Sequence, residues 1–246
     1  MYKSKKVIVV MPAYNAEKTL FKTYHEVLDQ EFVDQVIIVD DSSSDKTVEI
    51  ASKLSSAIVI THEVNKGYGA NQKTCYQAAL DEGGDIIIML HPDYQYTPKL
   101  IPAMVSLIGN ELYQCVLGSR ILGGHAHKNG MPLWRYVSNR FLTFFENILM
   151  GAKLSEYHTG YRAFSRELLN NLNIEKNSDD FIFDNQILAQ ILWHEYNIAE
   201  ISCPARYMPE SSSISFFNSV KYGFGCIATS ISFRLAKMRL IKNSRF

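Results

Sequence analysis

The chain has 246 residues with 25 basic and 25 acidic side chains, and this balance argues against a general nucleic-acid-binding protein, which carries a basic surplus. The length fits one large domain, or one domain with an appendage. Four scattered cysteines without metal-ligand spacing, no signal peptide and no apolar run of roughly 20 residues favour a cytoplasmic protein with reduced thiols and no membrane-spanning segment.

Short apolar runs are predicted to be β-strands that are buried on both faces. These runs are residues 5–11, 36–39, 85–90 and 115–118, and helical stretches at 19–30, 47–56 and 68–82 lie between them. This alternation predicts parallel β-α-β units. The expected fold class is therefore α/β, with a Rossmann-like, mostly parallel central sheet flanked by helices.

Polar and aromatic residues gather where each predicted strand ends. Ligands of open α/β sheets bind at the carboxyl ends of the strands, so these residues are predicted to form one site. Two adjacent carboxylates after the second strand, Asp40 and Asp41, need compensation from a base, a ribose, a cation or solvent. The alternative is a solvated loop in which Ser43 or Ser44 caps a helix that begins near Asp45. The segments after the first, third and fourth strands are PAYNAE, HPDYQY and SR.

The first strand is not followed by a glycine-rich turn, which argues against a dinucleotide dehydrogenase, and no Walker-type phosphate loop is present. Phosphate binding must then rely on a metal ion or on basic side chains. Asp93 is the natural metal ligand, because Mg²⁺ or Mn²⁺ on a diphosphate needs only one or two protein carboxylates. Gln95 could face the same side. The alternative is an ordinary turn in which Asp93 caps a helix near Pro98.

The pattern changes near residue 120. A loop is expected at 121–131, and a long amphipathic helix at 132–150, followed by a short helix after 156–164 and another helix at 177–192. A late strand at 198–207 precedes an apolar and aromatic tail at 216–241 with cations near its end. The side chains weighted to one side of the 132–150 helix are Trp134, Val137, Phe141, Phe144, Phe145 and Ile148.

The motifs PAYNAE, VDDSSSDKT, NKGYG, HPDYQY and GSR, in this order and spacing, resemble the inverting family 2 glycosyltransferases of GT-A fold. The similarity is closest to the dolichyl- and polyprenyl-phosphate mannose or glucose synthases. It continues through PLWRYVSNRF and TGYRAF and so covers residues 7–207. The resemblance implies a catalytic domain at 1–210, with a nucleotide-binding half at 1–120 and an acceptor half at 121–210. An amphipathic, helical C-terminal extension is expected at 211–246.

The resemblance also implies roles for particular residues. Asp93, with Gln95, would hold a divalent cation on the diphosphate; His91 replaces the family's usual aspartate there, so it could ligate the metal, bond a phosphate or support the loop. Arg120, Arg135 and Arg162 would neutralise phosphate charge on the donor or acceptor, unless they form surface salt bridges. The nucleotide-sugar would be framed by Pro12, Ala13, Tyr14, Asn15, Glu17, Asp40, Asp41, Ser42, Lys66, Gly67, Gly69, His91 and Arg120.

The implied reaction is metal-dependent transfer of a sugar, with inversion, from a UDP- or GDP-sugar to a lipid phosphate or to a glycan. A sugar hydroxyl as acceptor needs a general base, for which Asp180 and Asp184 are the candidates. A lipid phosphate is already an anion and needs only orientation by positive side chains, such as Arg135 and Arg162. The alternative for Asp180 is helix capping.

Other functions remain open at this stage. The substitution at His91 raises the alternative of a nucleotide-sugar-binding protein without catalysis, and a nucleotidyltransferase is disfavoured because its glycine-rich basic loop is missing. The 132–150 face and the cationic tail could lie against the inner face of an anionic membrane. They could equally pack against the protein core or against a partner in a homodimer.

Overall fold

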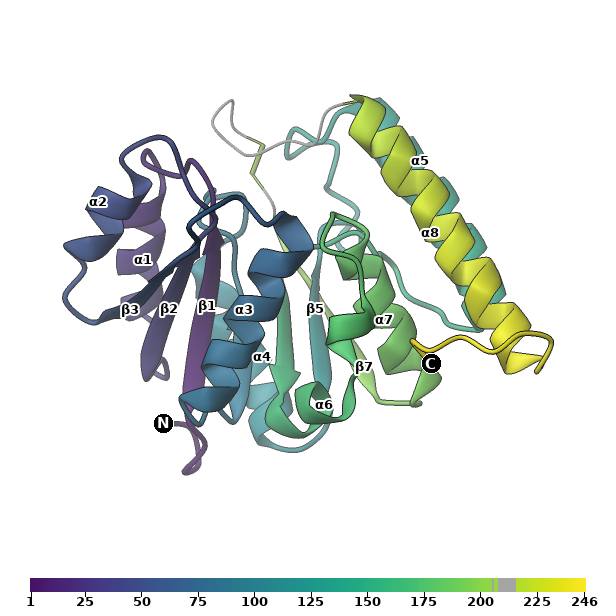
Figure 1. Ribbon diagram of the computed structural model, residues 1–246, viewed down its shortest axis with the longest axis horizontal. Coiled ribbons are helices and arrows are strands. Elements are labelled where there is room, and N and C mark those ends of the chain that lie inside the picture. Colours follow the sequence, from purple (N-terminus) through teal and green to yellow (C-terminus); the bar gives the residue numbers. More distant parts are fainter. Residues whose placement is uncertain (205, 208–215) are drawn as a thin grey trace.

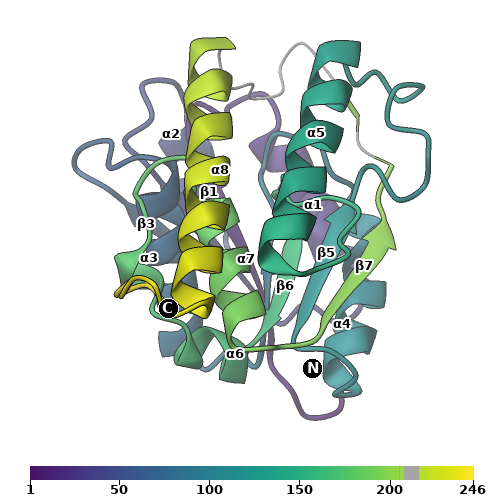
Figure 2. The same ribbon diagram turned by 90° about the vertical axis from the view of Figure 1, so that its right-hand side faces the viewer.

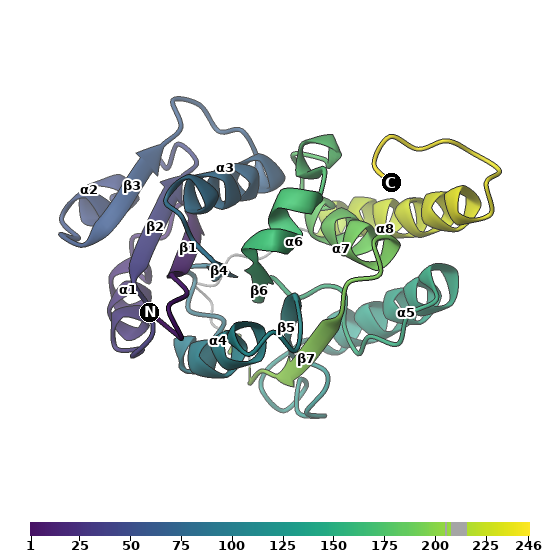
Figure 3. The ribbon, with the colours of Figure 1, turned by 90° about the horizontal axis from the view of Figure 1, so that it is seen from below.

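The computed structural model describes residues 1–204, 206–207 and 216–246. In these residues one sheet has the strand order β3-β2-β1-β4-β6-β5-β7. Helices α1, α2 and α4 cover one face of the sheet, and α3, α6 and α7 cover the other (Figures 1 and 3). The strands are β1 Val7–Ala13, β2 Gln35–Asp40, β3 Ala57–Thr61, β4 Ile86–Met89, β5 Cys115–Ser119, β6 Arg162–Ser165 and β7 Ile198–Ser202.

The helices confirm the predicted alternation with the strands. Each side of the sheet has its own apolar core, and the side chains of β1, β2 and β4 contribute to both cores. The helices are α1 Leu20–Leu28, α2 Thr47–Ser52, α3 Tyr68–Asp81, η1 Pro98–Leu100, α4 Ile101–Gly109, α5 Leu133–Met150, α6 Arg166–Asn171, η2 Ile174–Lys176, α7 Phe183–Trp193 and α8 Phe216–Lys237.

Two strands were not predicted from the sequence. β6 lies between β4 and β5 and pairs antiparallel with both, whereas the other neighbouring strands are parallel. Its segment was expected only to lead into a short helix. β3 is a half-exposed edge strand. The late strand is confirmed over Ile198–Ser202; residue 205 and the expected domain boundary at 210–211 lie outside the described residues.

The predicted capping by Ser43 or Ser44 was wrong. The Ser43 hydroxyl donates to Asp40 at 2.5 Å, and the Ser44 N–H donates to the Asn15 side chain at 2.9 Å. The first bond lies within the loop after β2 and the second joins this loop to the one after β1, while helix α2 begins beyond them at Thr47. Asp93 does not cap the helix near Pro98, because the side chain at the start of η1 that accepts a backbone N–H belongs to Thr97. The other part of that alternative, a turn held by Asp93, is present, since Asp93 accepts the Gln95 N–H.

Helices α5 and α8 form an outer layer on the side of α7 that faces away from the sheet. They lie side by side and point in the same direction (Figures 1 and 2). α8 confirms the helical C-terminal extension. Among the described residues, no helix is long and apolar enough to cross a membrane.

Candidate active site

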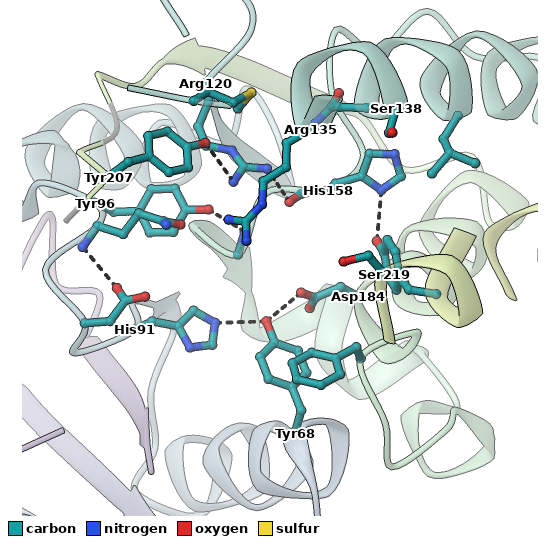
Figure 4. Close-up of a pocket in the computed structure, with 18 of the residues that line it drawn as sticks. Tyr68, His91, Tyr96, Arg120, Arg135, Ser138, His158, Asp184, Tyr207 and Ser219 are labelled. Carbon is teal, nitrogen blue, oxygen red and sulfur yellow. Dashed lines mark hydrogen bonds between the residues drawn. The ribbon is translucent and has the colours of Figure 1, made fainter. Parts of the chain in front are cut away.

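A pocket of about 250 Å³ opens beyond the carboxyl ends of β4 and β5 (Figure 4). One wall is the segment that follows β4. The opposite wall is the first half of α5 together with the start of α8, and α3 and α7 close the floor. The side chains that line it include Tyr68, His91, Asp93, Gln95, Arg120, Met131, Trp134, Arg135, Leu142, His158, Asp184 and Tyr222.

The three predicted metal ligands, His91, Asp93 and Gln95, line this pocket together. Asp93 Oδ1 accepts the backbone N–H of Gln95 at 3.0 Å, which fixes the turn. His91 Nε2 lies 3.1 Å from the Tyr68 hydroxyl. Removal from water lowers the pKa of His91, although the nearby Asp93 carboxylate acts in the opposite direction. A neutral imidazole beside carboxylate and amide oxygens is a donor set that fits Mn²⁺ or Mg²⁺.

Asp184 reaches the pocket from the first turn of α7. Its Oδ2 accepts the Tyr68 hydroxyl at 2.7 Å and its Oδ1 accepts the Gln72 amide at 3.0 Å. Removal from water and the Asp184 charge raise the pKa of Tyr68 well above its ordinary value, so Tyr68 remains a proton donor. Of the two predicted bases, Asp184 therefore has the better position.

Asp180 lies at the surface, where its carboxylate is 2.8 Å from the Lys221 ammonium. Its hydrogen bond with Lys221 lowers the pKa of Asp180. Asp180 Oδ1 also accepts the N–H of Phe181 at 2.8 Å. The alternative of helix capping was wrong, because α7 begins at Phe183 and has no side-chain capping hydrogen bond.

Arg162 is fully buried on β6. Its guanidinium donates to the backbone carbonyls of Thr159 at 2.8 Å, Asp184 at 2.7 Å and Tyr157 at 3.1 Å. It also lies 3.6 Å from Asp184 Oδ1. This burial argues against the predicted direct contact with an acceptor phosphate. Arg162 instead holds Asp184 and the segment that leads into β6.

Arg120 forms an ion pair with Glu156, which is fully buried. Arg120 Nε donates to Glu156 at 2.8 Å, and Nη2 donates to the His158 carbonyl at 2.7 Å. Burial acts to raise the pKa of Glu156, but the Arg120 guanidinium outweighs it and holds that pKa below its usual value. The charge that Arg120 presents to the pocket is therefore already balanced within the protein.

Arg135 differs from these two arginines. It comes from the first turn of α5, and Figure 4 shows its guanidinium pointing into the middle of the pocket. Its Nε is buried and has no hydrogen-bond partner among the described residues. The guanidinium lies 5.1 Å from the centre of the Trp134 ring, and Met131 and Leu142 also line the pocket. A cation with an unused buried donor beside apolar walls suits an anionic group attached to an apolar chain.

The predicted nucleotide-binding residues of the first two loops lie together but bond mainly to one another. Asp41 accepts the N–H groups of Lys66 at 2.8 Å and Gly67 at 2.9 Å, and it lies 2.7 Å from His62 Nδ1. Asp40 accepts from Ser43 in the same way. The two adjacent carboxylates thus have internal partners that anchor the Lys66–Gly67 segment.

The predicted nucleotide-binding residues of these loops differ in how far they are exposed to solvent. Pro12 and Ala13 are buried at the end of β1, and Asp40 is buried at the end of β2. Tyr14, Asn15 and Lys66 are exposed, while Glu17 and Ser42 are half-buried. The exposed side chains remain able to contact a nucleotide.

Gly67 and Gly69 have a packing reason to be glycines. Gly67 has φ +100°, and a Cβ there would lie 2.7 Å from the Asp179 carbonyl oxygen. A Cβ on Gly69 would lie 2.4 Å from the Ser178 carbonyl oxygen. The start of α3 therefore packs directly against the backbone that precedes α7.

Glu156 and Tyr222 were not predicted as site residues, and Tyr68 was included only as part of the segment from Lys66 to Gly69 that was expected along the nucleotide. Tyr68 and Glu156 belong to the NKGYG and EYHTGYRAF segments, so their motifs were visible while their roles were not. His158 Nδ1 lies 2.9 Å from the Tyr222 hydroxyl, and His158 Nε2 lies 3.3 Å from Glu146. Glu146, His158 and Cys226 form a buried cluster within 4.8 Å behind the pocket.

Residues 8–172 match the family described as Glycosyl transferase family 2. The chain belongs to this family. The resemblance drawn from the motifs is confirmed, and the chain is a glycosyltransferase.

Curated relatives cover most of the chain. One is the UDP-N-acetylglucosamine–dolichyl-phosphate N-acetylglucosaminyltransferase of Methanococcus voltae, 29% identical over 254 residues that cover 97% of this chain and 98% of that protein. Another is the dolichyl-phosphate hexose transferase of Haloferax volcanii, 29% identical over 80% of this chain and 82% of that protein.

Solved structures share the fold. Glucosyl-3-phosphoglycerate synthase of Mycobacterium tuberculosis in complex with UDP superposes with a TM-score of 0.72 at 21% identity, covering 98% of this chain and 82% of that one. A complex of the same enzyme with Mn²⁺, UDP-glucose and phosphoglyceric acid has a TM-score of 0.70. The predicted GT-A fold is confirmed.

Proposed function

We propose that this glycosyltransferase moves a sugar, with inversion, from a nucleoside diphosphate sugar to a polyprenyl phosphate, and that it depends on a divalent cation. The observation that carries the proposal is Arg135, a cation whose buried Nε has no described partner, set among apolar side chains in the pocket. A phosphate on a long apolar chain would give the Arg135 guanidinium an anionic partner. Its chain would give the apolar side chains of the pocket an apolar group to contact. The two archaeal relatives are named for transfer to dolichyl phosphate, which agrees with such an acceptor.

The donor diphosphate would lie along the wall formed by His91, Asp93 and Gln95. These side chains would hold the divalent cation, which would supply charge neutralisation for the departing nucleoside diphosphate. The manganese complex of the mycobacterial structure supports this assignment. Either a UDP- or a GDP-sugar is compatible with the site, and the Methanococcus relative favours testing UDP-sugars first.

The acceptor would enter from the opposite wall. Arg135 would bind its phosphate, while Trp134 and Leu142 would contact the first part of its apolar chain. Because a phosphate is already ionised, no general base is required. Asp184, held by Tyr68 and Arg162, would then shape the floor of the pocket; it would be the base if the acceptor were a sugar hydroxyl.

A product assay tests this function. The protein is incubated with Mn²⁺ or Mg²⁺, a panel of UDP- and GDP-sugars, and a polyprenyl phosphate in detergent, and glycosylated lipid phosphate is measured by mass spectrometry. We expect product from one class of donor and none after chelation of the metal. Donor binding without turnover would favour a non-catalytic binding protein. Transfer to glycan hydroxyls alone would contradict the lipid-phosphate acceptor.

Substitution of Arg135 tests the acceptor site separately. Arg135→Ala is expected to raise the KM for the lipid phosphate by about tenfold to a hundredfold, because a charge-assisted hydrogen bond is lost. Arg140→Ala, an exposed arginine on the same helix, is the matched control and should leave the KM unchanged. An equal change of the KM in the two variants would show that Arg135 does not bind the acceptor.

A further inference from the structure

Helix α5 carries its polar and apolar side chains in the reverse of the usual arrangement. The residues that it buries are Asn139, Thr143, Glu146 and Met150. Its exposed large side chains are Leu133, Trp134, Val137, Phe141, Phe144 and Ile148. Phe141 and Phe144 are 55% and 59% exposed. A helix of a soluble domain normally turns its apolar stripe toward the core, so this stripe needs another apolar partner.

Helix α8 lies beside α5 and also leaves apolar side chains exposed, namely Val220, Phe224 and Ile231. Its buried side is mixed: it carries Thr229 and Ser230 but also Cys226, Phe233 and Ala236. Figure 2 shows both helices in front of the rest of the molecule, with no other element covering them. The exposed apolar side chains of α5 and α8 are called the outer face below. The α5 stripe was predicted from the sequence, but its packing against the core, one of the proposed explanations, was wrong, because its side chains are exposed. For the tail, the same explanation holds in part, because Phe233 of α8 lies in the apolar core.

The charge carried by α5, α8 and the residues that follow α8 is one-sided, although Asp180 and Glu195 from neighbouring segments pair with Lys221 and Lys237 of α8. Residues 133–150 and 216–246 contain eight lysines and arginines and one acidic residue, Glu146. Glu146 is buried at 1% exposure. Because the whole chain has 25 basic and 25 acidic residues, the remaining residues hold 17 basic against 24 acidic side chains. Arg239 and Lys242 are exposed at the end of α8.

We propose that the outer face docks on the surface of an anionic lipid bilayer. Apolar side chains flanked by cations, without exposed acidic residues on the two helices, are the pattern of interfacial helices on anionic lipids. A second copy of this chain fits less well, since pairing two such faces would bring two sets of cations together. The proposal deepens the proposed function, because a bilayer is where a polyprenyl phosphate resides.

The outer face also meets the acceptor end of the pocket. Trp134 is 44% exposed on α5 and lines the pocket beside Arg135. The first halves of α5 and α8 both border the pocket, through Ser138 and Tyr222 among others. A protein docked through this face would present the pocket opening close to the lipid headgroups.

Vesicle sedimentation tests the docking with the complete chain. Phosphatidylcholine vesicles with and without phosphatidylglycerol are mixed with the unaltered protein and with the double variant Phe141→Ser/Phe144→Ser. We expect binding to the anionic vesicles, weakened by salt, and at least about a tenfold loss of affinity in the variant. Phe21→Ser/Leu112→Ser is the matched control, since both side chains are 58% exposed elsewhere on the molecule and should not change binding.

Transfer to a short-chain, water-soluble polyprenyl phosphate distinguishes this proposal from the proposed function. The Phe141→Ser/Phe144→Ser variant is expected to keep that transfer while it loses vesicle binding. If neither the unaltered protein nor the variants transferred sugar, the proposed function would be refuted, and the docking proposal would be unaffected. Equal vesicle binding by both double variants would overturn the docking. So would a dimer in sedimentation equilibrium that the Phe141→Ser/Phe144→Ser change dissociates.

Discussion

The arginines of the pocket differ in whether other residues of the protein supply their hydrogen-bond and charge partners. Arg120 is paired with buried Glu156, and Arg162 is bonded to backbone carbonyls beside Asp184. Such buried pairs are costly to break and position their surroundings. Arg135 has an unused buried donor instead. A ligand phosphate would therefore find its partner in Arg135 rather than in the two arginines that are already engaged.

Asp93 is the residue on which donor activation depends. Asp93→Asn is expected to lower metal-dependent release of nucleoside diphosphate by at least about a hundredfold, because an amide is a much weaker ligand for a hard cation than a carboxylate. The fold should be unchanged by circular dichroism. Asp29→Asn, an exposed aspartate at the end of α1, serves as the control. Normal turnover by Asp93→Asn would refute the assignment.

Much of the site was predictable at the residue scale, because the motifs place His91, Asp93 and Gln95 together after one strand. The burial of Arg162 was not predictable. An arginine in a short polar segment looks accessible in a sequence, and only the pairing of β6 between two strands removes it from solvent. The internal partners of Asp41 were not predictable either, because they come from a loop about 25 residues further along the chain, and the sequence does not show that the two segments are in contact.

At the scale of elements, the contact between α3 and the segment before α7 closes the floor of the pocket. The Gly69 N–H donates to the Asp179 carbonyl at 2.7 Å, and a side chain at Gly69 would also meet Phe183 Cβ at 2.8 Å. Both neighbours are held by backbone or by a buried ring, so neither can move away easily.

Gly69→Ala is therefore expected to lower the free energy of unfolding by about 1–3 kcal/mol, as measured by chemical denaturation. Gly223→Ala on α8 is the matched control. Its Cβ would meet Leu142 only at 3.7 Å, an ordinary contact. The control should be neutral or stabilising by up to about 1 kcal/mol, because alanine favours helix. Equal stability of the two variants would contradict the close approach of α3.

Most of the parallel strands and their helices were predictable because short continuous apolar runs and helical periodicity are local signals. β3 and β6 were missed, since one is a short half-exposed edge strand and the other has only four residues. The direction of the α5 stripe was also undetermined. Periodicity shows that a helix has an apolar side but does not say what that side contacts.

At the scale of the whole molecule, three features coincide at one end of the sheet. The carboxyl ends of β1, β2 and β4 carry the predicted nucleotide and metal residues, α5 supplies Arg135, and the outer face continues from the pocket along α5 and α8. The net charge of zero conceals this division between a basic helical layer and an acidic remainder.

The central claim is that a sugar nucleotide binds with its diphosphate at the end of β4 and is activated there. The most direct test is a crystal structure of the protein with Mn²⁺ and the donor selected by the product assay. We expect the diphosphate next to β4, with the metal bound to Asp93 and the sugar directed toward Arg135. A diphosphate bound away from Asp93, with full activity in the same preparation, would contradict the account.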